Sequence, residues 1–193
     1  MNSSIFPKPT EMAQHWLQQV IKPGDHVVDA TLGNGHDALF LAKCVGDQGK
    51  VFGFDVQEEA LQSATRQMNL HGISESVYQW HLISHACMRD RVTYPVKAVM
   101  FNLGYLPGAD HSIITSTEQT MMALEAAREL VAPGGIITVV CYPGHEGGEV
   151  EADAVREWAM RMGAEWHVIH YEKWATKNAA PELIAMQKKE ALS

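Results

Sequence analysis

The sequence predicts an α/β fold: a doubly wound sheet of seven strands, mostly parallel, with an antiparallel hairpin at its C-terminal end. Short apolar runs alternate with segments of helical period, which is typical of a parallel sheet covered by helices on both faces. The last two apolar runs are joined only by residues 173–181, too few for a crossover helix, so these strands should pair antiparallel. A chain of 193 residues suits one domain with a substantial core, and we expect a single domain over residues 1–193.

The expected elements follow this alternation along the chain. The first is an N-terminal helix of about residues 8–22, clearest at 11–21, that ends at Pro23-Gly24 and packs on the domain. Gly72 is a typical C-terminal cap for a helix predicted at 58–72, and Ser116 is a typical N-terminal cap for one predicted at 116–131. Further helices are predicted at 36–45, 58–72, 116–131 and 149–163. Strands are predicted at 26–30, 50–56, 77–83, 97–103, 134–142, 165–172 and 182–189.

Composition argues against several classes of protein. No apolar run approaches the ~20 residues that span a bilayer, and the N-terminal residues lack the basic flank and apolar centre of a signal peptide. The three cysteines lie far apart without a Cys-x-x-Cys pair, so neither a zinc site nor a disulfide framework is indicated. We expect a cytoplasmic protein without membrane contact. The net charge of −8 argues against a general nucleic-acid coat protein but leaves a local basic patch open.

The first predicted strand ends in the stretch VVDATLGNGHD, which continues into a glycine-rich turn. Ligands of open α/β sheets lie beyond the carboxyl ends of the strands, where the strand order switches. Gly33 and Gly35 let the backbone approach a ligand, and the next helix points its N-terminus there. Asp55 ends the second strand 20 residues beyond Gly35, a spacing that suits a carboxylate bound to a ribose diol.

These features fit NAD or S-adenosylmethionine (SAM), and three details favour SAM. Ala38 stands where a third glycine would complete a pyrophosphate cradle. Asp29 would repel a pyrophosphate but suits the amino end of a methionine moiety. A mostly parallel sheet with an antiparallel last hairpin is the architecture of class I, Rossmann-like methyltransferases. The alternative is an ordinary strand-to-helix turn with capping acids.

The loop after the third strand, LISHA, should lie near an adenine. Ser84 or His85 could contact the base, although His85 could equally be a surface histidine. His81 lies within the strand, whereas His85 and Cys87 lie beyond it, so these residues should not share a face. No metal is therefore expected.

The stretch FNLGYLPGAD ends the fourth strand on an amide, Asn102, beside the first strand. We expect Asn102 to face the reactive methyl group. Its side-chain carbonyl and a backbone carbonyl would accept hydrogen bonds from an amino group and aim the nitrogen lone pair at the methyl carbon, so that positioning supplies most of the catalysis. Tyr105 would stack on a planar base. The alternative is a capping asparagine beside a packed tyrosine.

The loop after the fifth strand, CYPGHEGG, lies at the same edge of the sheet. Tyr142 and His145 would border the acceptor pocket. His145 would take a proton from the amine, because imidazole titrates near neutral pH. A loop histidine bound to its own backbone is an equally good interpretation.

Two resemblances sharpen this hypothesis. Asn102 and Tyr105 resemble the Asn-Pro-Pro-Tyr motif of amino-group methyltransferases, with Leu103 and Gly104 replacing the prolines. The set DATLGNGHD, FGFDVQ, FNLGYLPGAD, YPGHEGG and NAAPELIAMQK resembles a family of small bacterial SAM-dependent methyltransferases described as putative rRNA methylases, over about residues 10–189. That family includes an enzyme that methylates the aminomethyl nitrogen of 5-aminomethyl-2-thiouridine at tRNA position 34. The resemblance implies this reaction, with tRNA bound through its anticodon stem-loop.

The residues and the resemblance together define the expected site. Residues expected to bind SAM are Asp29, Thr31, Gly33, Asn34, Gly35, Asp37, Asp55, Gln57, Ser84, His85 and Asn102. The acceptor side would hold Tyr105, Tyr142 and His145, and the catalytic residues would be Asn102, Tyr105 and His145.

Other functions stay open. A SAM-dependent enzyme could act on rRNA or on a protein or small-molecule amine, which the acidic charge favours slightly. A nucleotide- or NAD-binding protein without methyl transfer is disfavoured by Ala38 and Asp29. The chain carries no recognisable RNA-binding appendage, so a partner subunit or a homodimer could complete a tRNA surface around it, and a SAM-binding subunit without activity is a further alternative.

Overall fold

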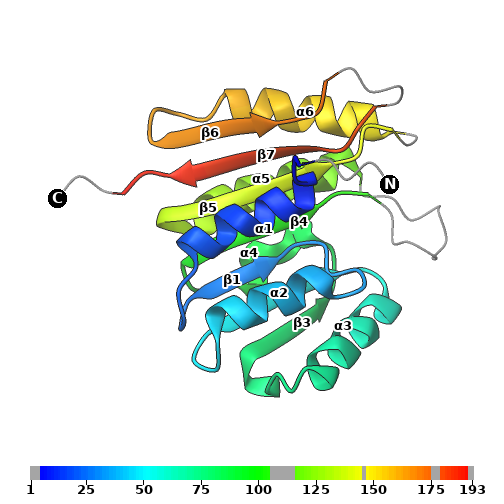
Figure 1. Ribbon diagram of the computed structural model, residues 1–193, viewed down its shortest axis with the longest axis vertical. Helices are drawn as coiled ribbons and strands as arrows, with labels where there is room; N and C mark the ends of the chain where they lie inside the picture. The colour runs from blue at the N-terminus through cyan, green and yellow to red at the C-terminus, as the bar shows by residue number, and fades with distance from the viewer. Residues whose placement is uncertain (1–4, 105–115, 145–146, 175–178, 191–193) are drawn as a thin grey trace.

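The computed structural model describes residues 5–104, 116–144, 147–174 and 179–190 (Figure 1). Its centre is one seven-stranded sheet of order β3-β2-β1-β4-β5-β7-β6. The strands are β1 (His26–Asp29), β2 (Lys50–Asp55), β3 (Tyr78–Leu82), β4 (Val96–Asn102), β5 (Val131–Cys141), β6 (Trp166–Tyr171) and β7 (Glu182–Lys188). β7 lies between β5 and β6 and pairs antiparallel with both, while the other pairs are parallel. The predicted α/β class, strand number and antiparallel end are confirmed.

Helices cover both faces of the sheet (Figure 1). The helices are α1 (Pro9–Val20), α2 (His36–Val45), α3 (Glu58–Leu70), α4 (Met88–Arg91), α5 (Thr117–Leu130) and α6 (Gly148–Met160), with short 3-10 turns η1 (Glu75–Val77) and η2 (His85–Cys87). One core lies under α1, α2 and α3, and the other lies under α4, α5 and α6. The predicted helices are present, and α4 was missed because four residues are too few to display a helical period.

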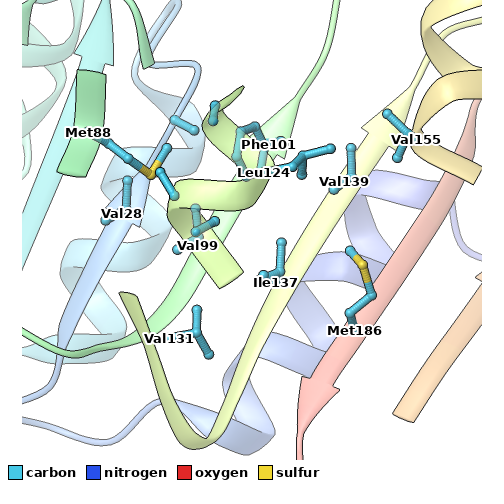
Figure 2. Packing of buried hydrophobic residues seen from close by; sticks show 14 of the residues in the cluster. Val28, Met88, Val99, Phe101, Leu124, Val131, Ile137, Val139, Val155 and Met186 are labelled. Carbon is cyan, nitrogen blue, oxygen red and sulfur yellow. The ribbon is translucent and has the colours of Figure 1, made fainter. Parts of the chain in front are cut away.

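Successive residues of the central strands supply the two cores alternately. Val27 and Met100 pack under the first group of helices, whereas Val28, Val99 and Phe101 pack under the second. Figure 2 shows the second core, where side chains from strands and helices meet. Because both faces are buried, the strands read as continuous apolar runs, and this is why their positions were predictable from the sequence.

The N-terminal helix begins at Pro9, which donates no hydrogen bond and so suits the first turn. Ala13 and Leu17 are fully buried on its inner face, and it contacts β4, β5 and β7. The inner face of α1 thus packs on the sheet. Among the described helices, none combines the length and the hydropathy needed to cross a bilayer.

Gly35 lies in a turn that leaves no room for a side chain. It precedes α2 with φ +79°, and a Cβ there would lie 2.5 Å from Ala64 Cα in α3. Replacement Gly35→Ala combines a left-handed backbone with a clash against backbone, so we expect a loss of at least about 2 kcal/mol in the free energy of unfolding in urea. Gly72→Ala is the matched control, since Gly72 has φ +67° but open space around it. It should cost only about 1 kcal/mol, and equal losses at both positions would contradict the packing argument.

Candidate active site

The strand order changes direction between β1 and β4, and the polar residues of the predicted site follow the carboxyl ends of β1, β2, β4 and β5. Figure 1 shows these ends along one edge of the sheet, with α2 beginning beside them. Ligands of open α/β sheets bind at this crevice. The topology therefore brings the loops predicted to bind SAM and the acceptor to one place.

Asp29 is a buried acid, and the nearby carboxylates of Asp37 and Asp55 favour a positive charge beside it. Its side chain is 1% exposed; Oδ1 accepts a hydrogen bond of 3.1 Å from the Thr31 amide, while Oδ2 is buried without a partner among the described residues. Burial, with the nearby carboxylates of Asp37 and Asp55, raises the pKa of Asp29 from 3.8 to about 8. A ligand ammonium group at Oδ2 would satisfy this oxygen and favour the ionised carboxylate.

Asp55 holds two loops at the end of β2. Its Oδ2 accepts from the Gly33 amide at 3.0 Å, and its Oδ1 accepts from the Gln57 amide at 3.0 Å. Each carboxylate oxygen can accept a second hydrogen bond, so both oxygens of Asp55 retain the capacity to bind a diol. The sequence predicted a ligand for Asp55, and the structure adds that the same carboxylate shapes the glycine turn.

The other predicted cofactor residues lie around this turn. Asn34 and Gly35 lead into α2, and Asn34 accepts a hydrogen bond from Ser63 at its carbonyl. His85 is buried, with Nδ1 3.1 Å from the Ala30 carbonyl oxygen and Nε2 without a partner among the described residues. Burial lowers its pKa, which keeps the imidazole neutral. His85 is thus not a surface histidine, and its ring joins the end of β1 to the loop after β3.

Ser84 has two local roles. Its Oγ accepts from the Ala86 amide at 3.2 Å and donates to Gln119 of α5 at 3.0 Å. These contacts cap η2 and tie it to α5. Ser84 therefore stabilises the loop after β3, and its contact with adenine stays a prediction.

Asn102 is held by a chain of hydrogen bonds at the end of β4. Its backbone amide donates to Thr31 Oγ1 at 2.8 Å, and its side-chain Nδ2 donates to Asp37 Oδ2 at 3.1 Å. The other carboxylate oxygen of Asp37 accepts from Gln14 Nε2 of α1 at 2.9 Å. Because the amide nitrogen of Asn102 points to Asp37, its carbonyl oxygen Oδ1 is the atom that can accept from an amine.

Gln14 was missed in the sequence. It lies between buried residues Ala13 and Leu17 of an amphipathic helix, where a single polar side chain looks like the edge of a solvated face. Only the packing of α1 across the sheet brings it to Asp37. No pattern within the helix would have revealed this contact.

Tyr142 lies beside Asn102 and Gly104, at the end of β4. It is half-buried, and a Cβ on Gly104 would be 3.5 Å from its ring. Burial and the Asp37 charge raise the pKa of its phenol, while a hydrogen bond with the Asn102 side chain opposes this shift. Tyr105 and His145, the other predicted acceptor residues, lie outside the described residues.

The expected cofactor fits these residues. The orphaned Oδ2 of Asp29 suits the amino group of a methionine moiety, the Asp55 carboxylate suits a ribose diol, and the turn at Gly33 (φ +47°) lets backbone come close. With an antiparallel β7 in the sheet, the fold and site define a class I, SAM-dependent methyltransferase. The cofactor supplies an electrophilic methyl group when it is bound.

Comparison with known proteins agrees with this class. The model of a family described as "Putative rRNA methylase" matches residues 51–187, and a model of protein-L-isoaspartate O-methyltransferases matches residues 3–90. The chloroplastic tRNA (mnm5s2U34)-methyltransferase of Arabidopsis thaliana is 35% identical in an alignment that covers 95% of this chain and 70% of that protein. The chain belongs to the putative rRNA methylase family.

Two crystal structures are similar over nearly the whole chain. A putative rRNA methylase from Clostridium thermocellum is 38% identical, with a TM-score of 0.92. The match covers 96% of this chain and 100% of that chain. A putative methyltransferase from Streptococcus mutans in complex with SAH is 32% identical with a TM-score of 0.87, covering 95% and 99% of the two chains. The predicted family and the SAM cofactor are confirmed.

Proposed function

We propose that this enzyme transfers a methyl group from SAM to the aminomethyl nitrogen of 5-aminomethyl-(2-thio)uridine at tRNA position 34, giving the methylaminomethyl form. The single observation that carries the proposal is the Asn102 amide, whose nitrogen donates to Asp37 and whose oxygen is therefore the acceptor for an amine. The similarity to a tRNA (mnm5s2U34)-methyltransferase supports the same acceptor.

The proposed reaction is a direct displacement. The neutral amine donates its lone pair to the methyl carbon, the carbon–sulfur bond breaks, and the ammonium product then loses a proton. Asn102 Oδ1 accepts an N–H of the amine and so directs the lone pair away from itself, toward the methyl group. Tyr105 would stack on the uracil ring and His145 would receive the proton, while Tyr142 would border the base.

Mass spectrometry of nucleosides tests this proposal. The enzyme and SAM are incubated with tRNA that carries 5-aminomethyl-2-thiouridine, and the nucleosides are then analysed. A gain of one methyl on that nucleoside is expected, and tRNA that lacks the aminomethyl group should stay unchanged. Equal methylation of both tRNAs would refute the amine acceptor. Methylation of rRNA or of a small amine in its place would assign the enzyme to the alternative substrate class.

Replacement Gln14→Ala tests how the amide is positioned. Without the Gln14 hydrogen bond, the Asp37 carboxylate loses its orientation, and the Asn102 amide follows it. We expect kcat to fall about tenfold while the affinity for tRNA is unchanged. Gln18→Ala, at an exposed position of the same helix, is the control. Equal rates for the two variants would remove Gln14 from the positioning chain.

A cytoplasmic location, a grip on the anticodon stem-loop and a homodimer that completes the RNA surface belong to the same proposal. They rest on the expected substrate and on the composition of the chain. Size-exclusion chromatography with light scattering, with and without an anticodon stem-loop, would test the last two.

A further inference from the structure

A second polar site lies beyond the cofactor crevice, where β6 ends and β7 begins. A hollow of about 420 Å³ opens there, and its lining includes Pro143, Glu149, Arg156, Glu172, Lys173 and Glu182. Figure 1 shows the two strand ends side by side, with α6 alongside them. Glu182 pairs with Cys141 at the end of β5, so the hollow adjoins the loop that carries Tyr142.

Glu172 and Glu182 line this hollow, and together with His170 they offer ligand atoms to one point. His170 and Glu172 are two residues apart at the end of β6, and Glu182 begins β7. His170 Nε2 lies 2.6 Å from Glu182 Oε2 and 3.7 Å from Glu172 Oε2, and the three ligand atoms lie within 4.8 Å of one another. Ligand atoms of a tetrahedral ion with bonds of ~2.1 Å are about 3.4 Å apart. The observed separations lie on either side of that value.

An ion pair with Arg156 holds the Glu182 carboxylate in a fixed orientation. The Glu182 side chain is only 2% exposed, and its second oxygen, Oε1, accepts from Arg156 Nη1 at 2.6 Å. Asp153 and Glu149 bind Arg156 in turn. A carboxylate ligand that is held by an outer hydrogen bond is typical of metal sites, because the outer contact fixes the oxygen that faces the ion.

The charge balance favours a cation over an anion. Among the described residues, four carboxylates (Glu149, Asp153, Glu172 and Glu182) face two cations, Arg156 and Lys173, which is an excess of two negative charges. A phosphate group would meet this excess unfavourably, whereas a divalent cation would neutralise it. The imidazole together with two carboxylates suits a borderline transition metal such as Zn²⁺ and not Mg²⁺ or Ca²⁺, which prefer oxygen alone.

The geometry points to a divalent transition-metal site formed by His170, Glu172 and Glu182, with its remaining coordination position open to the hollow. The ion takes the place of the hydrogen bond between His170 Nε2 and Glu182 Oε2, and it ties β6 to β7 beside Tyr142 and Pro143. This site is independent of the proposed tRNA substrate.

Calorimetric titration of the chelator-treated enzyme with Zn²⁺ tests the site. One ion per chain is expected to bind, and bound Zn²⁺ should raise the melting temperature. His170→Ala and Glu172→Gln should each weaken the binding at least tenfold, while SAM affinity stays unchanged. His167→Ala removes an exposed histidine of the same strand and should bind Zn²⁺ as the unaltered enzyme does.

The outcome is decisive in both directions. No saturable binding of Zn²⁺, or the same affinity in His170→Ala as in the unaltered enzyme, would overturn the site. Both replaced side chains are at least one third exposed, so the folded state should persist, and a melting curve of each variant without metal checks this. Loss of binding in both variants but not in the control establishes the ligands.

Discussion

Replacing Asp29 by asparagine is expected to stabilise the cofactor-free enzyme and to impair its binding of SAM. Burial of the Asp29 carboxyl, with Asp37 and Asp55 nearby, raises its folded pKa to about 8, above the unfolded value of 3.8. Between these two pH values the folded state holds a proton that the unfolded state has lost. Stability therefore falls as pH rises from about 4 to about 8, because ionisation of Asp29 then opposes folding.

An asparagine at this position carries no charge and avoids that loss. The variant should match the unaltered enzyme near pH 4 and exceed it at pH 8 by a few kcal/mol in the free energy of unfolding, since one pKa unit corresponds to about 1.4 kcal/mol. Urea denaturation across this pH range measures the difference. Asp47→Asn, which changes an exposed acid, should leave the pH dependence as it is.

The same replacement removes the expected partner of the SAM amino group. Loss of one member of a buried charge pair costs about 2–5 kcal/mol, so calorimetry should show SAM affinity reduced by at least about thirtyfold. The unaltered enzyme should release a proton when SAM binds at pH 7, because an ammonium group next to Asp29 favours its ionised form. Binding heats that do not depend on the ionisation heat of the buffer would contradict this role.

Asn102→Ala should abolish methyl transfer while the cofactor still binds. The variant keeps the backbone amide that donates to Thr31, so the end of β4 should stay in place. It loses the carbonyl that orients the amine, and a misplaced nucleophile typically costs about a hundredfold in rate. We expect kcat to fall by at least that factor and SAM affinity to stay within about tenfold, or about 1.4 kcal/mol.

Single-turnover kinetics with SAM and modified tRNA would measure this effect. Asn69→Ala, at an exposed position of α3, serves as the control for a change from asparagine to alanine. Unchanged turnover in Asn102→Ala would show that the amide does not position the acceptor. A parallel loss of SAM binding would leave Asn102 with only its predicted role in binding the cofactor.

Much of the site could be predicted because its chemistry follows strand ends. Asp29, Asp55 and Asn102 are each the last residue of a strand that is buried on both faces. Such strands are continuous apolar runs, so they can be recognised in the sequence without knowledge of the residues that pack on them. The carboxyl ends of parallel strands share one edge, so residues distant in the sequence could be assigned to one crevice. The hairpin followed from the short connection before β7.

Contacts between elements were not predictable in this way. Gln14 reaches Asp37 only because α1 packs across β4, β5 and β7, and the direction of a helix on a sheet depends on side-chain packing that no local pattern encodes. Gly35 illustrates the same limit. Its positive φ was foreseeable in a tight turn, but its contact with Ala64 depends on where α3 lies.

By itself the sequence determined the α/β class, the order of elements along the chain and the acids at the ends of the strands. These features depend on the period of apolar residues and on the loops directly after them. Three features were decided by the tertiary structure alone. Asp29 has one oxygen without a partner among the described residues, Asn102 is oriented by Asp37 and Gln14, and His170 meets Glu182. Each of these depends on desolvation and on distances between separate elements, which exist only once the chain has folded.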